Sequence, residues 1–212
     1  MKNRALKESI ISGLKYLLKK NLNIGSEGNI SIRNEKGFFI SPSAYKPDEL
    51  KLNNIAFIDL DGKVNGNTKP SSEWKMHQYI YINRKDVNAI VHCHSVWASC
   101  VSCLRINIPS FHYMIAEFGG DNIKCSNYAT FGTEKLAKNV LDSLVNRKGC
   151  LLANHGQITI GDSITEAIHL TEAVEKLSKQ FFLCRMTGDL KLLRKNQIDE
   201  VLDLFGDYKT KR

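Results

Sequence analysis

The sequence predicts a single α/β domain over residues 1–212, with a mixed or antiparallel sheet and helices packed on it. Two observations lead to this class. Short runs rich in β-branched and aromatic residues alternate along the chain with longer segments whose apolar residues recur at helical spacing. No repeat, low-complexity segment or clear linker divides the chain, and 212 residues suffice for one sizeable core.

The first half of the chain is expected to form a helix, a hairpin, a strand and a second helix. The apolar residues of the first segment share one helical face, and a short polar turn separates the two hairpin strands. Ser-Ser-Glu after a proline is a common helix start. The expected elements are a helix over 5–20, strands over 30–33 and 37–41, a strand over 55–59, a loop over 65–70 and a helix starting near Ser71.

The second half continues the alternation. A capping box, Ser163 to Glu166, predicts the start of a long helix that ends at Gly188. The other expected elements are a strand over 88–94, a short helix over 95–103, loop and strand through 108–132, a helix over 133–146, strands over 150–154 and 157–160, and a last helix over about 197–205.

Charge and composition narrow the possible partners. The chain carries 30 Lys and Arg against 22 Asp and Glu, a net charge of +8, but the basic residues are scattered and no aromatic residues interleave with them. This pattern disfavours nucleic acid and suits a field that attracts a phosphorylated small molecule. No run approaches the roughly 18 apolar residues of a membrane span. We expect a cytoplasmic protein whose six cysteines are buried, reduced thiols, because they lack paired spacing.

Two histidines mark the most informative stretch of the chain. His92 and His94 are separated by one residue on an expected strand, so they project from the same face, while Cys93 points to the other. His155, at another strand end, could complete a three-histidine site of the kind that holds a catalytic zinc ion with one position open. The alternative for an isolated pair is a chance arrangement on a half-buried strand.

Three loops offer groups that could bind a phosphate. They contain Gly28-Asn29, Ser43 and Ser71-Ser72, whose small side chains, hydroxyls and backbone N–H groups suit an anion, above all at a helix N-terminus. Each could also be an ordinary turn or helix start. Glu73, expected in the first helical turn, could ligate the metal, act as a general base or only complement the helix dipole.

Taken together, these segments resemble the class II aldolase/adducin family over almost the whole chain. Two further stretches resemble its fuculose-phosphate branch, His112–Ala116 with Gly119-Gly120, and Tyr128–Thr133. The family motifs are matched by Gly25–Arg33, Ser41–Ala44, Pro70–Trp74, His92–His94 and Asn154–Gly156.

The resemblance implies a zinc-dependent lyase with one Zn²⁺ per subunit, a central antiparallel sheet with helices on both sides, and a homotetramer with sites between subunits. It would cleave a ketose 1-phosphate, foremost L-fuculose 1-phosphate, through a zinc-stabilised enediolate to dihydroxyacetone phosphate and an aldehyde such as L-lactaldehyde. The residue roles that it implies are metal ligation by Glu73, His92, His94 and His155; acid/base catalysis by Glu73 with assistance from Tyr113; phosphate binding by Gly28, Asn29, Ser43, Ala44, Ser71 and Ser72; and aldehyde positioning by Phe131 and Tyr208.

Departures from the family pattern leave the substrate open. Glu27 introduces a negative charge into the first phosphate loop, and Ala44 stands where the family often has glycine. Alternatives within the family are 5-deoxyribulose or another pentulose 1-phosphate as substrate, a pentulose-phosphate 4-epimerase, which typically has Asp where Glu73 stands, and a methylthio-pentulose-phosphate dehydratase. A non-enzymatic, adducin-like scaffold is the alternative of another class. Cobalt or manganese could replace zinc.

Overall fold

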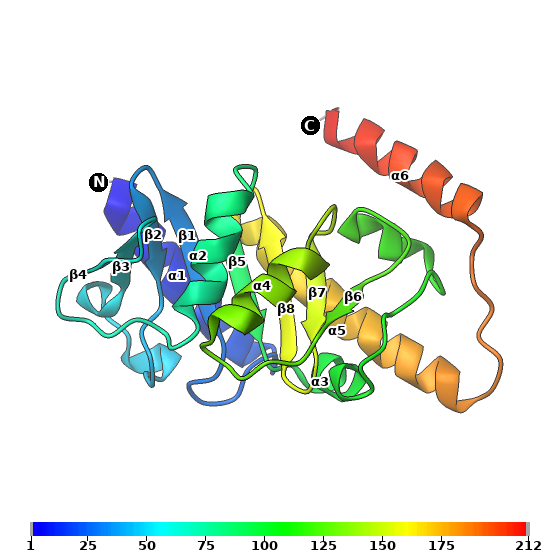
Figure 1. Cartoon of the computed structure of the whole chain (residues 1–212), viewed down its shortest axis with the longest axis horizontal. Coiled ribbons are helices and arrows are strands. Elements are labelled where there is room, and N and C mark those ends of the chain that lie inside the picture. The colour runs from blue at the N-terminus through cyan, green and yellow to red at the C-terminus, as the bar shows by residue number, and fades with distance from the viewer. Residues whose placement is uncertain (1, 211–212) are drawn as a thin grey trace.

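An eight-stranded sheet forms the centre of the molecule in the computed structural model, which describes residues 2–210, the last four by backbone alone (Figure 1). Its strand order is β4-β3-β2-β1-β5-β8-β7-β6. All neighbours pair antiparallel except β6 and β7, which are parallel, so the expected mainly antiparallel sheet is confirmed. The strands are β1 Asn29–Asn34, β2 Gly37–Ile40, β3 Ala56–Asp59, β4 Val64–Asn65, β5 Ala89–Cys93, β6 Lys124–Ser126, β7 Gly149–Leu152 and β8 Gly156–Gly161.

Helices cover both faces of this sheet, as expected. Helices α2 and α4 lie on one face, α1 and α5 on the other, and α6 lies apart from the sheet (Figure 1). Among residues 2–210, no helix is long and apolar enough to cross a bilayer. The helices are α1 Lys2–Lys19, α2 Trp74–Asn83, α3 Val96–Cys103, α4 Glu134–Ser143, α5 Ile164–Met186 and α6 Lys195–Thr210, with short 3-10 helices η1 Pro47–Glu49, η2 Leu52–Asn54 and η3 Tyr113–Phe118.

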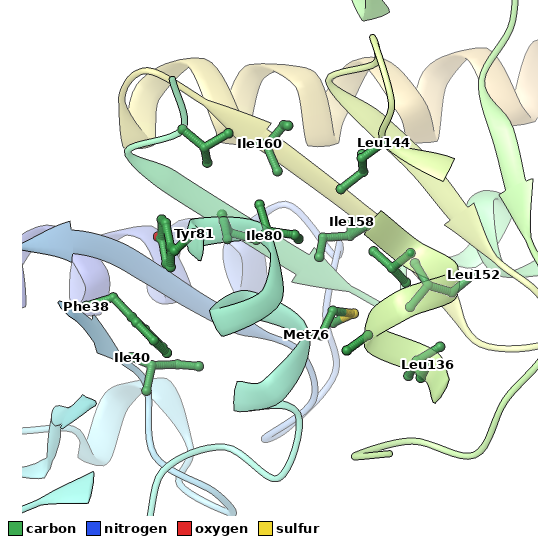
Figure 2. Close-up of a cluster of buried hydrophobic side chains, with 14 of the residues drawn as sticks. Phe38, Ile40, Met76, Ile80, Tyr81, Leu136, Leu144, Leu152, Ile158 and Ile160 are labelled. Atoms are coloured by element: carbon green, nitrogen blue, oxygen red, sulfur yellow. The ribbon is translucent and has the colours of Figure 1, made fainter. Parts of the chain in front are cut away.

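Strand alternation divides the core between the two faces. Ile90 of β5 belongs to the cluster under α2 and α4, whereas its neighbours Ala89 and Val91 pack under α1. In Figure 2, Met76 and Ile80 of α2 lie between side chains of β2 and side chains of β7 and β8. Helix α2 is thereby fixed above the middle of the sheet. A third cluster, under α3 and η3, packs against α5.

The start of α2 differs from the sequence expectation. The helix begins at Trp74, with Glu73 as its N-cap residue at φ −101° and ψ 12°. Residues before it continue an extended pairing instead, since Pro42 bridges Pro70 and the Ser71 N–H donates to the Ser41 carbonyl. This pairing holds Ser71 out of the helix and leaves Glu73 at its tip.

Three smaller features differ from the sequence expectations: the cap of α5, strand β4 and the exposure of the cysteines. The Ser163 hydroxyl accepts from the Glu166 N–H, as a capping box requires, but the Glu166 carboxylate accepts from Asp162 and not from Ser163. Strand β4 was not expected. All six cysteines are free, as predicted, but the expectation that all are buried is wrong, because three are exposed: Cys100, Cys103 and Cys184.

Candidate metal centre

Four metal-ligand side chains converge where the central strands end. His92 lies on β5 opposite Asn29 of β1, and His94 follows just past the end of β5. His155 occupies the turn between β7 and β8, and Glu73 caps α2 above it. The ligand atoms of these four residues all lie within 4.8 Å of one another.

The turn that carries His155 requires its two neighbours. Asn154 adopts a left-handed conformation at φ 53°, which asparagine tolerates better than most residues. A Cβ on Gly156 would lie 2.5 Å from the Cys93 carbonyl oxygen and 3.1 Å from the His94 ring. Asn-His-Gly is therefore the sequence that lets this turn pass closely over the end of β5.

The carboxylate of Glu73 contacts two of the imidazoles. Its Oε2 lies 3.1 Å from His92 Nε2, and its Oε1 lies 3.3 Å from His155 Nε2. His94 Nε2 lies 3.1 Å from His92 Nε2 and 3.0 Å from His155 Nε2. All three rings present Nε2 to one point.

Charge and burial set the protonation of the cluster. Burial, with the charge of His92, lowers the pKa of His94 and of His155 to about 4. Burial also opposes a charge on His92, but the Glu73 carboxylate outweighs it and raises the pKa of His92. Burial alone would raise the pKa of Glu73; the imidazoles, His92 first, reverse this and hold that pKa well below its usual range. Glu73 is therefore ionised at neutral pH.

The donor set fits a divalent cation. His92 Nδ1 lies 2.8 Å from the Gln157 carbonyl oxygen, which can only accept, so Nδ1 carries a proton and Nε2 is the nitrogen left to bind a cation. Ring nitrogens that converge at about 3 Å repel one another unless a cation or proton lies between them. Glu73 Oε1 is buried and has no hydrogen-bond partner among the described residues. Three imidazoles and a carboxylate suit zinc, with cobalt or manganese as possible alternatives.

Asn29 and Ser71 of the predicted phosphate loops contact Glu73, and several donors of these loops already have partners within the chain. The Ser43 N–H donates to Lys69 and the Ser71 N–H to Ser41, which corrects the expectation of a free Ser71 N–H at a helix start. The Asn29 amide donates to Glu73 Oε2. Ser72 is exposed beside them.

Two loop positions have left-handed backbones. Gly28 has φ 69°, and a Cβ there would meet the His92 carbonyl oxygen at 2.6 Å. Ala44 has φ 62°, so this exposed loop residue adopts the conformation that glycine would adopt more easily. Both loops need this geometry, and only the first has the glycine.

Tyr113 and Phe131, two of the residues predicted near the aldehyde, are exposed in the single chain. Tyr113 begins η3, is 51% exposed and stacks on His112, whose Nδ1 caps the same helix. Phe131 is 63% exposed. Tyr208 lies in α6, but its side chain is outside the described residues. Within the described part of the chain, no hydrogen bond links Tyr113 to the metal ligands.

Several residues around the ligands were not predicted from the sequence. Asn23 is buried, accepts from the His94 N–H and leaves its own amide nitrogen unpartnered within the described chain. Glu27 is exposed, but its Oε2 lies 3.7 Å from His94 Nδ1. Gln157 fixes His92 through its backbone. Only Glu27 gave a signal in the sequence, as a charge in a phosphate loop.

Comparison with known proteins agrees with this geometry. Residues 8–182 match the model of the class II aldolase and adducin N-terminal domain. An L-fuculose phosphate aldolase of Haemophilus influenzae is 40% identical over 97% of this chain and 96% of its own. A 5-methylthioribulose-1-phosphate/5-deoxyribulose-1-phosphate aldolase of Rhodospirillum rubrum is 39% identical over 96% of this chain and 92% of its own.

A solved structure of an L-fuculose 1-phosphate aldolase superposes with a TM-score of 0.92 at 33% identity, over 95% of this chain and 96% of that one. The likeness therefore extends over the sheet, the helices on both of its faces and the loops between them. The chain belongs to the class II aldolase and adducin family.

Proposed function

We propose that this chain is a metal-dependent aldolase that cleaves a ketose 1-phosphate into dihydroxyacetone phosphate and an aldehyde. The observation that carries the proposal is the convergence of Glu73 and three imidazoles on one point. A purely structural scaffold has no need of a buried carboxylate opposite three histidines, because burying such groups without a bound cation is costly. The relatives named as sugar-phosphate aldolases support the same activity.

The metal would be held by Glu73, His92, His94 and His155, one ion per chain, with zinc preferred. When bound, it supplies a Lewis acid that stabilises the negative charge developing as the carbon–carbon bond breaks. Glu73, ionised at neutral pH, is suited to accept and return the proton that the reaction exchanges at carbon. Tyr113 would exchange a proton with the oxygen that becomes the aldehyde.

The phosphate would be held by the loops around the cluster, through Gly28, Asn29, Ser43, Ala44, Ser71 and Ser72. Anchoring the phosphate away from the breaking bond positions the reacting carbons over the metal ligands. The net charge of +8 favours the approach of an anionic substrate. The side chain of Asn29 already contacts Glu73, so this residue would join the anchoring loop to the catalytic carboxylate.

The aldehyde half would be bound between subunits of a homotetramer. Tyr113 and Phe131 are large and about half or more exposed in the single chain, which suits residues that a neighbouring subunit covers. Phe131, with Tyr208 from α6, would position the aldehyde. L-fuculose 1-phosphate is the leading substrate. The Rhodospirillum relative favours 5-deoxyribulose or 5-methylthioribulose 1-phosphate as the second candidate.

The test is release of dihydroxyacetone phosphate, followed through a coupled NADH-dependent dehydrogenase. Zinc-loaded protein is given each candidate ketose 1-phosphate, with and without a chelator, and the unphosphorylated sugar serves as the control. We expect chelator-sensitive release that requires the phosphate, and the preferred sugar identifies the aldehyde half. Absence of release from every ketose 1-phosphate by folded, metal-loaded protein would contradict the proposal.

A further inference from the structure

A chain of hydrogen bonds runs through the interior and ends on the Glu73 carboxylate. Tyr81 Oη lies 2.8 Å from Ser31 Oγ, which lies 2.7 Å from His77 Nδ1. His77 Nε2 lies 2.5 Å from Asn29 Oδ1, and Asn29 Nδ2 donates to Glu73 Oε2 at 3.0 Å. All five side chains are buried, and Ser31, His77 and Tyr81 are fully so.

The Glu73 carboxylate at the end of the chain determines which group donates in each hydrogen bond. An ionised carboxylate can only accept, so Asn29 turns its NH₂ group to Glu73 and its oxygen to His77. His77 Nε2 must then carry a proton and donate it. Burial lowers the pKa of His77 to about 3, so the ring is neutral and its Nδ1 accepts from the Ser31 hydroxyl. Ser31 in turn accepts from Tyr81.

This arrangement selects one of the two orientations of the Asn29 carboxamide. Rotated by 180°, the amide would have nearly the same shape, but it would present its oxygen to the Glu73 carboxylate and repel it. A donor on the far side of the amide selects the correct orientation, and His77 supplies that donor. The fixed positions of β1 and α2 hold the two ends, since Asn29 and Ser31 lie on β1 while Glu73, His77 and Tyr81 lie on α2 or cap it.

We propose that His77 is a positioning residue. It orients the Asn29 amide and, through it, the Glu73 carboxylate, for metal binding and proton transfer. Ser31 and Tyr81 support it by fixing which ring nitrogen carries the proton. The catalytic part of this inference rests on the proposed function, but the metal-binding part does not.

The test compares three substitutions on α2. His77→Leu removes the donor to Asn29, His77→Gln retains an N–H donor of similar reach, and Ile80→Ala is a matched control that disturbs the same buried helix without entering the hydrogen-bond chain. Zinc affinity of each purified, folded variant is measured by competition with a chromophoric chelator. Visible spectra of the cobalt-loaded proteins report ligand geometry. Turnover is then separated into kcat and KM.

We expect His77→Leu to lose roughly 10- to 100-fold in metal affinity or kcat, as for partners that orient ligands elsewhere. The KM should change less than kcat, because the substitution reaches the phosphate loops through the Asn29 side chain alone, and the cobalt spectrum should shift. His77→Gln should recover most of the loss, and Ile80→Ala should match wild type in affinity, kcat and spectrum. If His77→Leu does not fold, Ser31→Ala, which frees the His77 ring, is expected to give a smaller loss with the same spectral shift.

Two results would overturn the inference. One is wild-type metal affinity, spectrum and kcat in His77→Leu, or in Ser31→Ala if that variant replaces it. The other is an equal loss in Ile80→Ala, which would make the effect one of general packing. Wild-type protein that binds metal but releases no dihydroxyacetone phosphate would instead refute the proposed function and leave the spectral and affinity comparison to decide the role of His77.

Discussion

The two halves of the candidate site differ in how they are held. The metal half, Glu73 with His92 and Asn29, lies on β1, β5 and the tip of α2, is buried, and is joined by hydrogen bonds to the core. The half expected to meet the aldehyde, Tyr113 and Phe131, lies on a 3-10 helix and a loop, and is exposed. Under the proposed function, the sheet would fix the residues that carry the reaction chemistry, while loops that can vary with little cost to the core would select the substrate.

The substitution expected to have the largest effect is Glu73→Gln, in the metal half. Glutamine has nearly the same shape but cannot ligate or accept a proton as the carboxylate does. We expect the fold to persist, some metal to remain and turnover to fall roughly 10²- to 10⁴-fold. Coupled release of dihydroxyacetone phosphate and metal analysis of the same sample measure both effects. Turnover at the wild-type rate would remove Glu73 from its assigned role.

Acid should lower the free energy of unfolding of the metal-free protein, through the buried imidazoles in and beside the metal half. The pKa is lowered to about 4 for His94 and His155 and to about 3 for His77, so the unfolded state binds more protons than the folded state between those values and about 6.5. Stability thus decreases as pH falls through this window. His92, whose pKa is raised, opposes part of the loss.

Urea denaturation at intervals from pH 7 to pH 4 measures this loss. We expect a loss of several kcal/mol, set by the three imidazoles that must take up protons less the opposing contribution of His92. The His77→Gln variant, which lacks one of the buried imidazoles, should show a flatter profile. Equal or greater stability at pH 4 than at pH 7 would show that His77, His94 and His155 are not neutral and desolvated as described.

A change in the exposed half should alter selectivity and leave metal content intact. Phe131→Ala removes a large aromatic surface on the aldehyde side, and we expect the ratio of kcat/KM between two ketose 1-phosphates to change by roughly 10-fold, about the effect of a small hydrophobic contact. Metal per chain should stay at the wild-type value. A uniform loss for all substrates together with loss of metal would place Phe131 with the metal half.

The smallest expected effect comes from Ala44→Gly. Ala44 has φ 62°, where an L-residue with a Cβ is strained. Glycine relieves that strain but costs unfolded-state entropy, so we expect a net gain of about 0.5 kcal/mol in the free energy of unfolding. Chemical denaturation measures it against an alanine-to-glycine change at exposed Ala5, the fourth residue of α1, which should destabilise. Destabilisation at both positions would contradict the strain.

The sequence predicted the metal half better than its surroundings for a physical reason. Strand alternation places His92 and His94 on one face, and this needs only local geometry. Glu73 was expected in a helical turn, yet the Pro42–Pro70 bridge delays the helix and leaves it as the cap. That bridge joins segments 28 residues apart, so no local pattern reveals it.

The hydrogen-bond chain could not be predicted from local sequence patterns either. Ser31 and Tyr81 are ordinary residues of a strand and a helix, and only the packing of α2 over β1 brings them to His77. A histidine one helical turn after Glu73 could equally be a packing residue, so the sequence does not reveal the hydrogen bonds of His77 to Ser31 and Asn29. Asn29 was expected to bind phosphate, and its side chain is found between His77 and Glu73.

The most direct test of the central claim is a metal titration followed by turnover. Metal-stripped protein receives increasing zinc, and bound metal per chain and release of dihydroxyacetone phosphate are measured on the same samples, with His92→Ala as the control. We predict that release rises in proportion to bound zinc, saturates at one ion per chain, and stays near zero in the control. Release that is independent of zinc, or His92→Ala protein that binds zinc and turns over like wild type, would contradict the assignment of the metal centre.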